Sequence, residues 1–196
     1  DRLYPGNEPF VDNRLPSGYA PFNVQAIGND IVVTYVLHPD SRSTTPIAGP
    51  SLGYVDIYSP SGVLLTRLEH NDAMDVPYGV SLAPLDFGAF SHALLVAQSG
   101  TDHGESAGTI AAYDIVTGKF EGRLKDTAGK TLVIPGLHGL APGNSAPANF
   151  DAAASPPSSP GAELYYTAFT GQGAQAPSLF GFLTPVAADL IKGNDQ

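Results

Sequence analysis

The chain has 196 residues, of which 22 are glycine and 18 proline, and 42% are hydrophobic. So much Gly and Pro excludes a fold of long helices, because both destabilise a helix interior, while the apolar content suffices for one domain with a core. The net charge of −10 argues against binding to nucleic acid or to an anionic membrane surface, and the lack of cysteine excludes disulfides and thiolate chemistry.

The opening stretch, DRLYPGNEPF, is polar and has neither an initiator Met nor a secretory leader, and we expect a processed product or a fragment of something longer. No later window approaches the roughly 18 apolar residues of a membrane span. Residues 1–19 are therefore interpreted as an N-terminal extension or linker.

Short runs rich in Val, Ile, Tyr, Phe and Thr then recur, each bounded by Gly, Pro, Asn or Asp, which predicts β-strands. No segment before the tail, residues 186–196, has a helical period. The predicted strands cover residues 23–26, 31–37, 54–58, 64–68, 79–83, 93–98, 109–114, 120–124, 137–140, 164–169 and 179–183. The expected fold class is all-β.

The strands fall into a repeat. Residues 53–68 and 108–124 both read as a strand, a turn closed by Gly and a second strand that ends near an Arg. Pro21 precedes Pro77 by 56 residues, and Gly79 precedes Gly139 by 60. A unit of four strands at this spacing is typical of a β-propeller blade.

We therefore expect about three four-stranded blades, over residues 20–75, 76–135 and 136–185, the last with a low-complexity loop at 144–162. Propellers typically need four to eight blades to close. The missing blades of a ring, which we expect to be six-bladed, would come from another chain or from the rest of the precursor, and a higher-order assembly is a further alternative.

Two stretches carry a family resemblance: VPYGVSLAPLDFGAFSHALLVAQSG (76–100) and GTIAAYDIVTGKFEGRLKDTAGKTLVIPGLHGL (108–140). They resemble a family of exported bacterial and algal proteins of unknown function, some with a PEP-CTERM sorting tail, and this chain is similar to the C-terminal half of its members. The chain departs from the family at Tyr78 and at His138, each of which stands where the family usually has Trp, and in a longer link at residues 101–106. The resemblance implies an NHL-like β-propeller that is secreted or at the cell surface, and it implies no activity.

Two groups of residues are candidates for a site. Asp102, His103 and Glu105 offer oxygen and imidazole ligands for Ca²⁺ or another divalent cation at a propeller rim, although a solvated loop between strands is the favoured interpretation. His138, Tyr78, Asp75 and His70 are placed by the repeat near the predicted central channel, which they would line; for His138 the alternative is plain packing.

Two other motifs are interpreted as structural. Ser91 and His92 are adjacent and would point to opposite faces of an extended segment, so we expect Ser91 to cap a turn and predict no catalytic residue. Asp114 opens the turn DIVTG and is expected to cap backbone amides there.

Three functional hypotheses remain. The first is a non-catalytic, extracellular or cell-surface propeller that acts as a binding, scaffold or assembly module without a cofactor. The second is a cation-dependent propeller hydrolase, similar to a lactonase, with a site in its channel. The third is a structural subunit of an extracellular filament.

Overall fold

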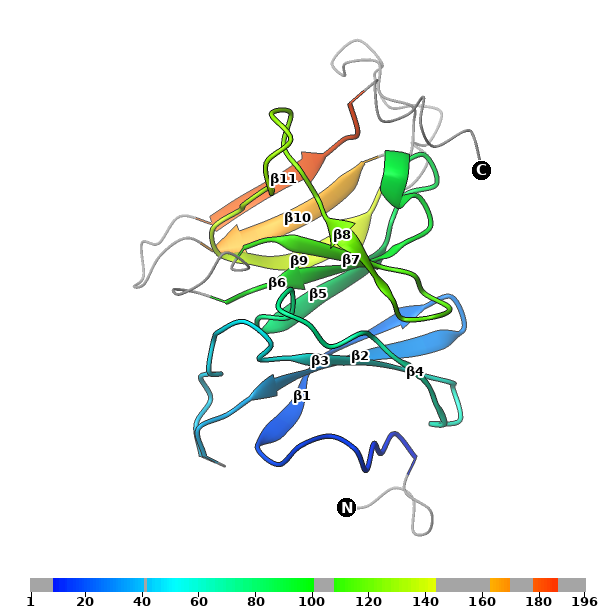
Figure 1. Ribbon diagram of the computed structural model, residues 1–196, viewed down its shortest axis with the longest axis vertical. Helices are drawn as coiled ribbons and strands as arrows, with labels where there is room; N and C mark the ends of the chain where they lie inside the picture. Colours follow the sequence, from blue (N-terminus) through cyan, green and yellow to red (C-terminus); the bar gives the residue numbers. More distant parts are fainter. Residues whose placement is uncertain (1–8, 41, 101–107, 144–162, 170–177, 187–196) are drawn as a thin grey trace.

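The computed structural model describes residues 9–40, 42–100, 108–143, 163–169 and 178–186. Its regular structure there is eleven β-strands and one 3₁₀ turn, η1 (Gly88–Phe90). The strands form three antiparallel sheets of four, four and three strands (Figure 1). The all-β prediction is confirmed, and within the described residues no helix is long and apolar enough to cross a membrane.

The first sheet is a meander of neighbouring strands in chain order. It contains β1 (Tyr19–Ile27), β2 (Asp30–Leu37), β3 (Tyr54–Tyr58) and β4 (Leu64–Arg67). A two-residue turn joins β1 to β2, and its Gly28 has φ +60°, a conformation that glycine adopts without steric cost.

The second and third sheets repeat this order. The second contains β5 (Pro77–Leu82), β6 (Leu94–Gln98), β7 (Ile110–Tyr113) and β8 (Phe120–Arg123). The third contains β9 (Leu137–Pro142), β10 (Leu164–Phe169) and β11 (Ser178–Leu183). Every predicted strand is present, although β1 begins at Tyr19 rather than at residue 23, and in the described residues the third sheet has no fourth strand.

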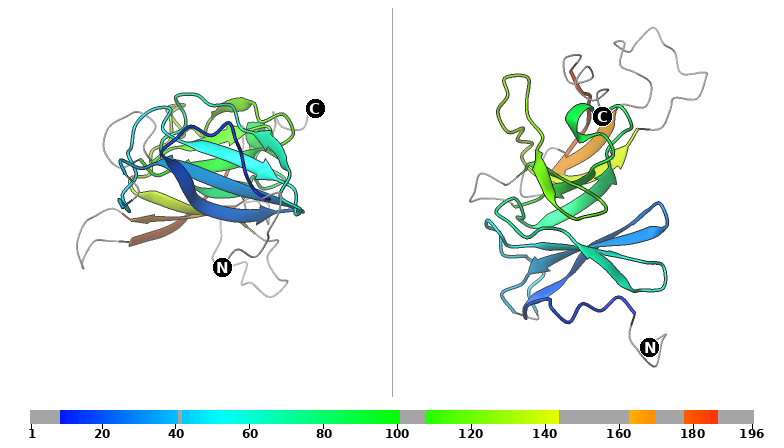
Figure 2. Two further views of the ribbon diagram at one scale, coloured as in Figure 1. Left: turned by 90° about the horizontal axis from the view of Figure 1, so that it is seen from below. Right: turned by 45° about the vertical axis from the view of Figure 1, so that its right-hand side comes forward.

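The sheets are stacked face to face in chain order along the longest axis of the molecule, and the view from below shows them overlying one another (Figures 1 and 2). Successive side chains of a strand point to opposite faces, so the second sheet serves two cores. One core lies between the first and second sheets and includes Val32, Val55, Ile57, Leu94, Val96, Ala111 and Tyr113. The other lies between the second and third sheets and includes Leu95, Ala97, Ile110, Ala112, Leu137, Leu164 and Ala168.

The first strands of the three sheets lie next to one another, since β5 packs against both β1 and β9. The side-chain amide of Asn23 on β1 donates to the carbonyl of Tyr78 on β5, at 2.9 Å. At Gly79 the backbone of β9 approaches so closely that a Cβ atom would lie 2.7 Å from the nitrogen of Leu140. A side chain at this position would push the strands apart.

Candidate functional site

The two ends of the stack are the faces that no sheet of the described chain covers, and they differ in chemistry. The face of the third sheet that is turned away from the second, here called the distal face, presents Tyr165, Thr167 and Phe169 from β10 and their cross-strand neighbours Phe180 and Phe182 from β11. Tyr165 stacks on Phe180 with ring centroids 5.7 Å apart.

Solvent reaches these rings. Phe180 is 75% exposed, Phe182 54% and Phe169 47%, whereas the residues on the corresponding face of the second sheet, such as Leu95 and Ala112, are fully buried by the third sheet. The five residues of the distal face carry no charge. The distal face is therefore an aromatic, uncovered surface. A partner that covered it would remove a large apolar area from contact with water, which favours binding.

A hollow of about 400 Å³ indents one end of this face. His138, residues 167–169 and residues 178–180 line it. The Nδ1 atom of His138 lies 2.7 Å from the carbonyl oxygen of Gly136, which can only accept, so Nδ1 carries a proton and donates this bond. The hollow thus combines aromatic walls with hydroxyl and imidazole groups, and it can receive an uncharged, partly polar group.

Two of the predicted channel residues are brought together. Tyr78 and His138 meet edge to face with centroids 5.2 Å apart, and Phe22 meets Tyr78 in the same way at 5.1 Å. These three residues follow the repeat, since each stands near the start of the first strand of its sheet. They form one aromatic line across β1, β5 and β9.

The other two predicted channel residues lie elsewhere. Asp75 is 1% exposed, and its carboxylate accepts the backbone N–H of Gly49 at 2.8 Å. His70 is exposed and stacks on the ring of Tyr54, with centroids 4.3 Å apart. Neither is shown in contact with the aromatic line, and whether a channel exists beside them stays a prediction.

The predicted cation ligands Asp102, His103 and Glu105 lie outside the described residues. Among the residues that are described, no group of three or more His, Asp or Glu side chains is arranged to hold a metal ion. The Ca²⁺ hypothesis therefore stays a prediction.

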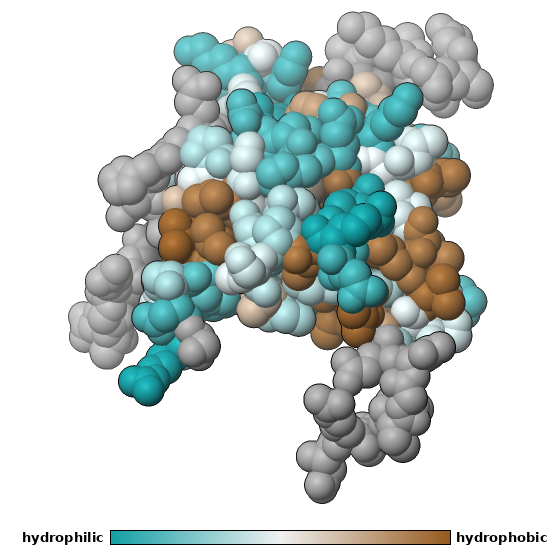
Figure 3. All heavy atoms as spheres, turned by 60° about the horizontal axis from the view of Figure 1, so that its bottom comes forward, coloured by the Kyte–Doolittle hydropathy of each residue, from teal (hydrophilic) through white to brown (hydrophobic). Residues whose placement is uncertain are grey.

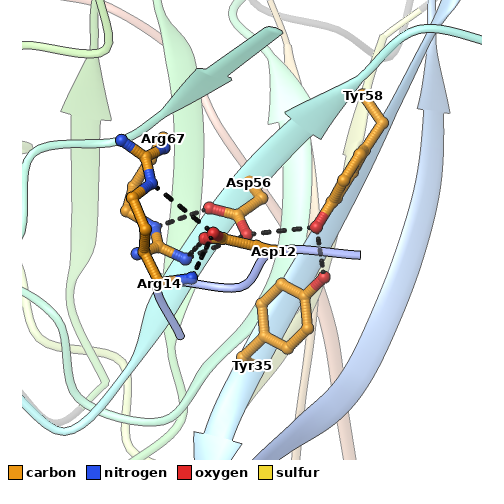
Figure 4. Close-up of polar contacts among 6 residues, drawn as sticks. All are labelled: Asp12, Arg14, Tyr35, Asp56, Tyr58 and Arg67. Carbon is orange, nitrogen blue, oxygen red and sulfur yellow. Dashed lines mark hydrogen bonds and ion pairs between the residues drawn. The ribbon is translucent and has the colours of Figure 1, made fainter. Parts of the chain in front are cut away.

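The opposite end of the stack carries a polar cluster on the outer face of the first sheet (Figure 4). Asp56 on β3 is fully buried and pairs with Arg67 on β4 through two contacts, Nε to Oδ1 at 2.8 Å and Nη2 to Oδ2 at 3.2 Å. The hydroxyl of Tyr58 donates to Asp56 Oδ2 at 3.3 Å, and the hydroxyl of Tyr35 lies 2.8 Å from that of Tyr58. Because Tyr58 gives its proton to Asp56, Tyr35 is the donor in the second bond.

Burial sets the protonation behaviour of this cluster. It raises the pKa of Asp56 to about 6, outweighing the hydrogen bond from Tyr58 and the charge of Arg14, which both lower it. Burial also raises the pKa of Tyr58 and lowers that of Arg67. An aspartate with a pKa near 6 can change its charge close to neutral pH.

Residues 9–15, here called the strap, cover the cluster. The ring of Phe10 lies against that of Tyr58 with centroids 5.6 Å apart, and the Phe10 N–H donates to the carbonyl of Gly62 at 2.9 Å. Asp12 forms an ion pair with Arg67, and its side chain is only 2% exposed. The strap thus acts as the cover that a neighbouring sheet supplies to the other two sheets.

On its outer side, the strap exposes Val11, which is 43% exposed, and the Phe10 ring is still 39% exposed although it lies against Tyr58. When the end of the molecule with the first sheet is turned toward the viewer, separate apolar patches lie among hydrophilic ones (Figure 3). The apolar surface here is broken up, in contrast to the cluster of rings on the distal face.

Sequence reasoning did not find the polar cluster. A signal existed in the repeat: Arg67 and Arg123 hold the same place in the first and second units, yet their cross-strand partners are Asp56 and Ala111. Asp56 is charged where the equivalent strand of the second unit has Ala111, which indicates that a different kind of segment covers this face of the first sheet. That the strap supplies this cover follows from tertiary contacts alone.

Both motifs that the sequence assigned to turns behave as predicted. The Ser91 hydroxyl accepts the N–H of Phe87 at 3.0 Å and donates to the carbonyl of Gly88 at 2.8 Å, as a capping serine does. Asp114 Oδ1 accepts the backbone N–H groups of Val116 and Thr117 at 2.9 and 2.6 Å, and these bonds lower its pKa.

No family model and no solved structure matches the chain. Three uncharacterized proteins of Acanthamoeba polyphaga mimivirus are similar to it. One is 35% identical over 126 residues, or 64% of this chain and 22% of the relative; a second is 30% identical over 138 residues, or 68% and 33%; a third is 28% identical over 138 residues, or 68% and 35%. The chain spans at most about a third of the length of these relatives.

Proposed function

We propose that the chain is a non-catalytic β-propeller segment that serves as an assembly module: the distal face docks a further sheet, and additional sheets complete a ring. The aromatic distal face is the observation that carries this proposal. In the described chain, the equivalent face of the first sheet is covered by the second sheet and that of the second by the third, so a cover on the third continues the same packing.

The chemistry of the face supports a protein partner of the same architecture. Its rings are uncharged, and they stand at the alternate positions of β10 and β11 that a packed sheet would bury. The hollow beside His138 has room for one bulky side chain from such a sheet. The source of the additional sheets in our proposal is another part of a longer polypeptide or a second chain, and secretion or display at a cell surface is part of the same proposal.

The mass of the chain in solution tests the docking. We expect the wild-type chain to associate until the missing sheets are supplied, and a Phe180→Asp/Phe182→Asp variant to be monomeric, because buried, unpaired carboxylates oppose docking. Both positions are more than half exposed, so the substitutions leave the described cores intact. The control is Val116→Asp, at a 78% exposed position in the turn between β7 and β8, which should associate as the wild type does.

Native mass spectrometry and size-exclusion chromatography provide the measurement. A compact wild-type monomer that elutes together with the double variant would refute the proposal. The same samples distinguish the other two hypotheses: a cation-dependent hydrolase predicts a melting temperature that falls when a chelator is added, and a filament subunit predicts fibres in the electron microscope.

A further inference from the structure

The strap binds the first sheet through three different kinds of contact. It places one backbone donor on Gly62, one aromatic ring on Tyr58 and one carboxylate on Arg67. A Cβ atom added at Gly62 would collide with Pro9 and would lie 2.8 Å from the Phe10 nitrogen, so the strap lies directly on this glycine. The receptor surface is therefore defined by a carbonyl acceptor, a tyrosine ring and a guanidinium.

These three features select a sequence pattern. The Phe10 ring and the Asp12 carboxylate both contact the first sheet, and a single residue, Val11, separates them in the chain. Val11 between them points outward and is 43% exposed. The strap thus presents to this face an aromatic residue followed two positions later by an acidic one.

The second unit indicates that the sheet is adapted to this ligand. Tyr113 and Arg123 occupy the places that Tyr58 and Arg67 have in the first unit, but a sheet covers Tyr113, and Ala111 stands opposite Arg123 where Asp56 stands opposite Arg67. Only in the first unit does a buried Asp56 hold the arginine with two contacts, which fixes the guanidinium for a second carboxylate.

The strap is held in place at a conformational cost. Phe10 has φ +64°, in the left-handed region that a bulky residue enters only with backbone strain. A segment that presents the same groups from an unstrained backbone would avoid this cost. The strap is therefore a ligand that a better one can displace.

We propose that the outer face of the first sheet is a binding site for a segment of a partner protein with an aromatic residue two positions before an Asp or Glu, and that residues 9–15 occupy this site as an intramolecular ligand. The site lies at the other end of the stack from the distal face, so its binding is measured separately from docking there; a ring that closed on the first sheet would also have to displace the strap.

A peptide in solution tests the site. The probe is a fluorescent peptide of residues 9–15, PFVDNRL, and the receptor is the full chain with Phe10→Ala and Asp12→Asn, which release the strap. We expect saturable binding by fluorescence anisotropy, and binding to the wild-type chain that is weaker by about tenfold, because a tethered strap competes at an effective concentration in the millimolar range.

The peptide also supplies the controls, since its variants leave the protein unchanged. Peptides with the Phe replaced by Ala, or the Asp by Asn, should lose binding by about tenfold or more, as expected for a lost ring contact or ion pair in a desolvated site. Equal binding of all peptides, or no binding to a folded receptor variant, would overturn the proposal.

A second measurement does not depend on the receptor variant being folded. In the wild-type chain, hydrogen exchange at the Phe10 amide should quicken when the peptide is added at saturating concentration, because displacement of the strap breaks its bond to Gly62. An unchanged exchange rate at this amide would also refute the site.

Discussion

Gly79 is the position at which the packing of the sheets can be tested with a single methyl group. In Gly79→Ala, the new Cβ atom would lie 3.0 Å from the carbonyl carbon of Gly139 and 2.7 Å from the nitrogen of Leu140, and closer still to the carbonyl oxygen of His138. Ordinary contact begins at 3.4 Å. All three atoms belong to the backbone of β9, which cannot rotate away as a side chain can.

The cost follows from what β9 holds in place. Leu137 at its start is fully buried in the core between the second and third sheets, so a shift of β9 opens this core. Overpacking of a well-packed interior costs about 1–3 kcal/mol and sometimes more, and we expect about 3 kcal/mol here because only backbone can yield. For a chain of this size, this lowers the melting temperature by about 6–12 °C.

Denaturant unfolding followed by tyrosine fluorescence measures this cost, and Gly129→Ala is the matched control. Gly129 has φ +77° and nothing within 4 Å of an added Cβ, so its substitution costs only the conformational penalty, about 1 kcal/mol. If Gly79→Ala were no more destabilising than Gly129→Ala, the inference that β5 and β9 lie too close together to admit a methyl group at Gly79 would be wrong.

Three further predictions concern buried side chains. The buried hydroxyl of Tyr113 has no hydrogen-bond partner among the described residues, so Tyr113→Phe should leave the free energy of unfolding unchanged or raise it slightly. Tyr58→Phe should lower the free energy of unfolding by about 1–3 kcal/mol, because it breaks the hydrogen bonds that link Tyr35 to Asp56. Equal effects of the two substitutions would contradict this prediction. Burial raises the pKa of Asp56 to about 6, so between about pH 4 and pH 6 the native state keeps a proton that the unfolded chain has lost. The free energy of unfolding should therefore fall as the pH rises through this range, by up to about 3 kcal/mol relative to Asp56→Asn. Parallel pH profiles of the two proteins would show that the pKa of Asp56 is not raised by folding. Leu95→Ala should cost about 2–5 kcal/mol because Leu95 is fully buried between two sheets, while Val116→Ala, at an exposed turn, should stay within about 0.5 kcal/mol, and a small loss for Leu95→Ala would place it outside the core.

The candidate site was only partly predictable. The repeat placed Tyr78 and His138 at equivalent ends of strands, and the structure brings their rings together. Asp75 and His70 are close to the same strands in sequence but are held by loop contacts, Asp75 by the amide of Gly49 and His70 by the ring of Tyr54. Contacts between loops depend on the path of the chain in space, which spacing does not encode.

The sequence by itself determined the strands and their two-sidedness. Alternation along β2 already separates Val32 from Val33, and the second copy of the hairpin predicts β7 and β8 from β3 and β4, because side-chain direction and turn chemistry are local properties. Only the tertiary structure decided what covers each face. Val32 faces a sheet and Asp56 a seven-residue strap, while Phe180 faces solvent. Burial depends on contacts between segments that are distant in the chain. A pattern of apolar and polar residues therefore predicts that a face is buried but does not predict which segment covers it.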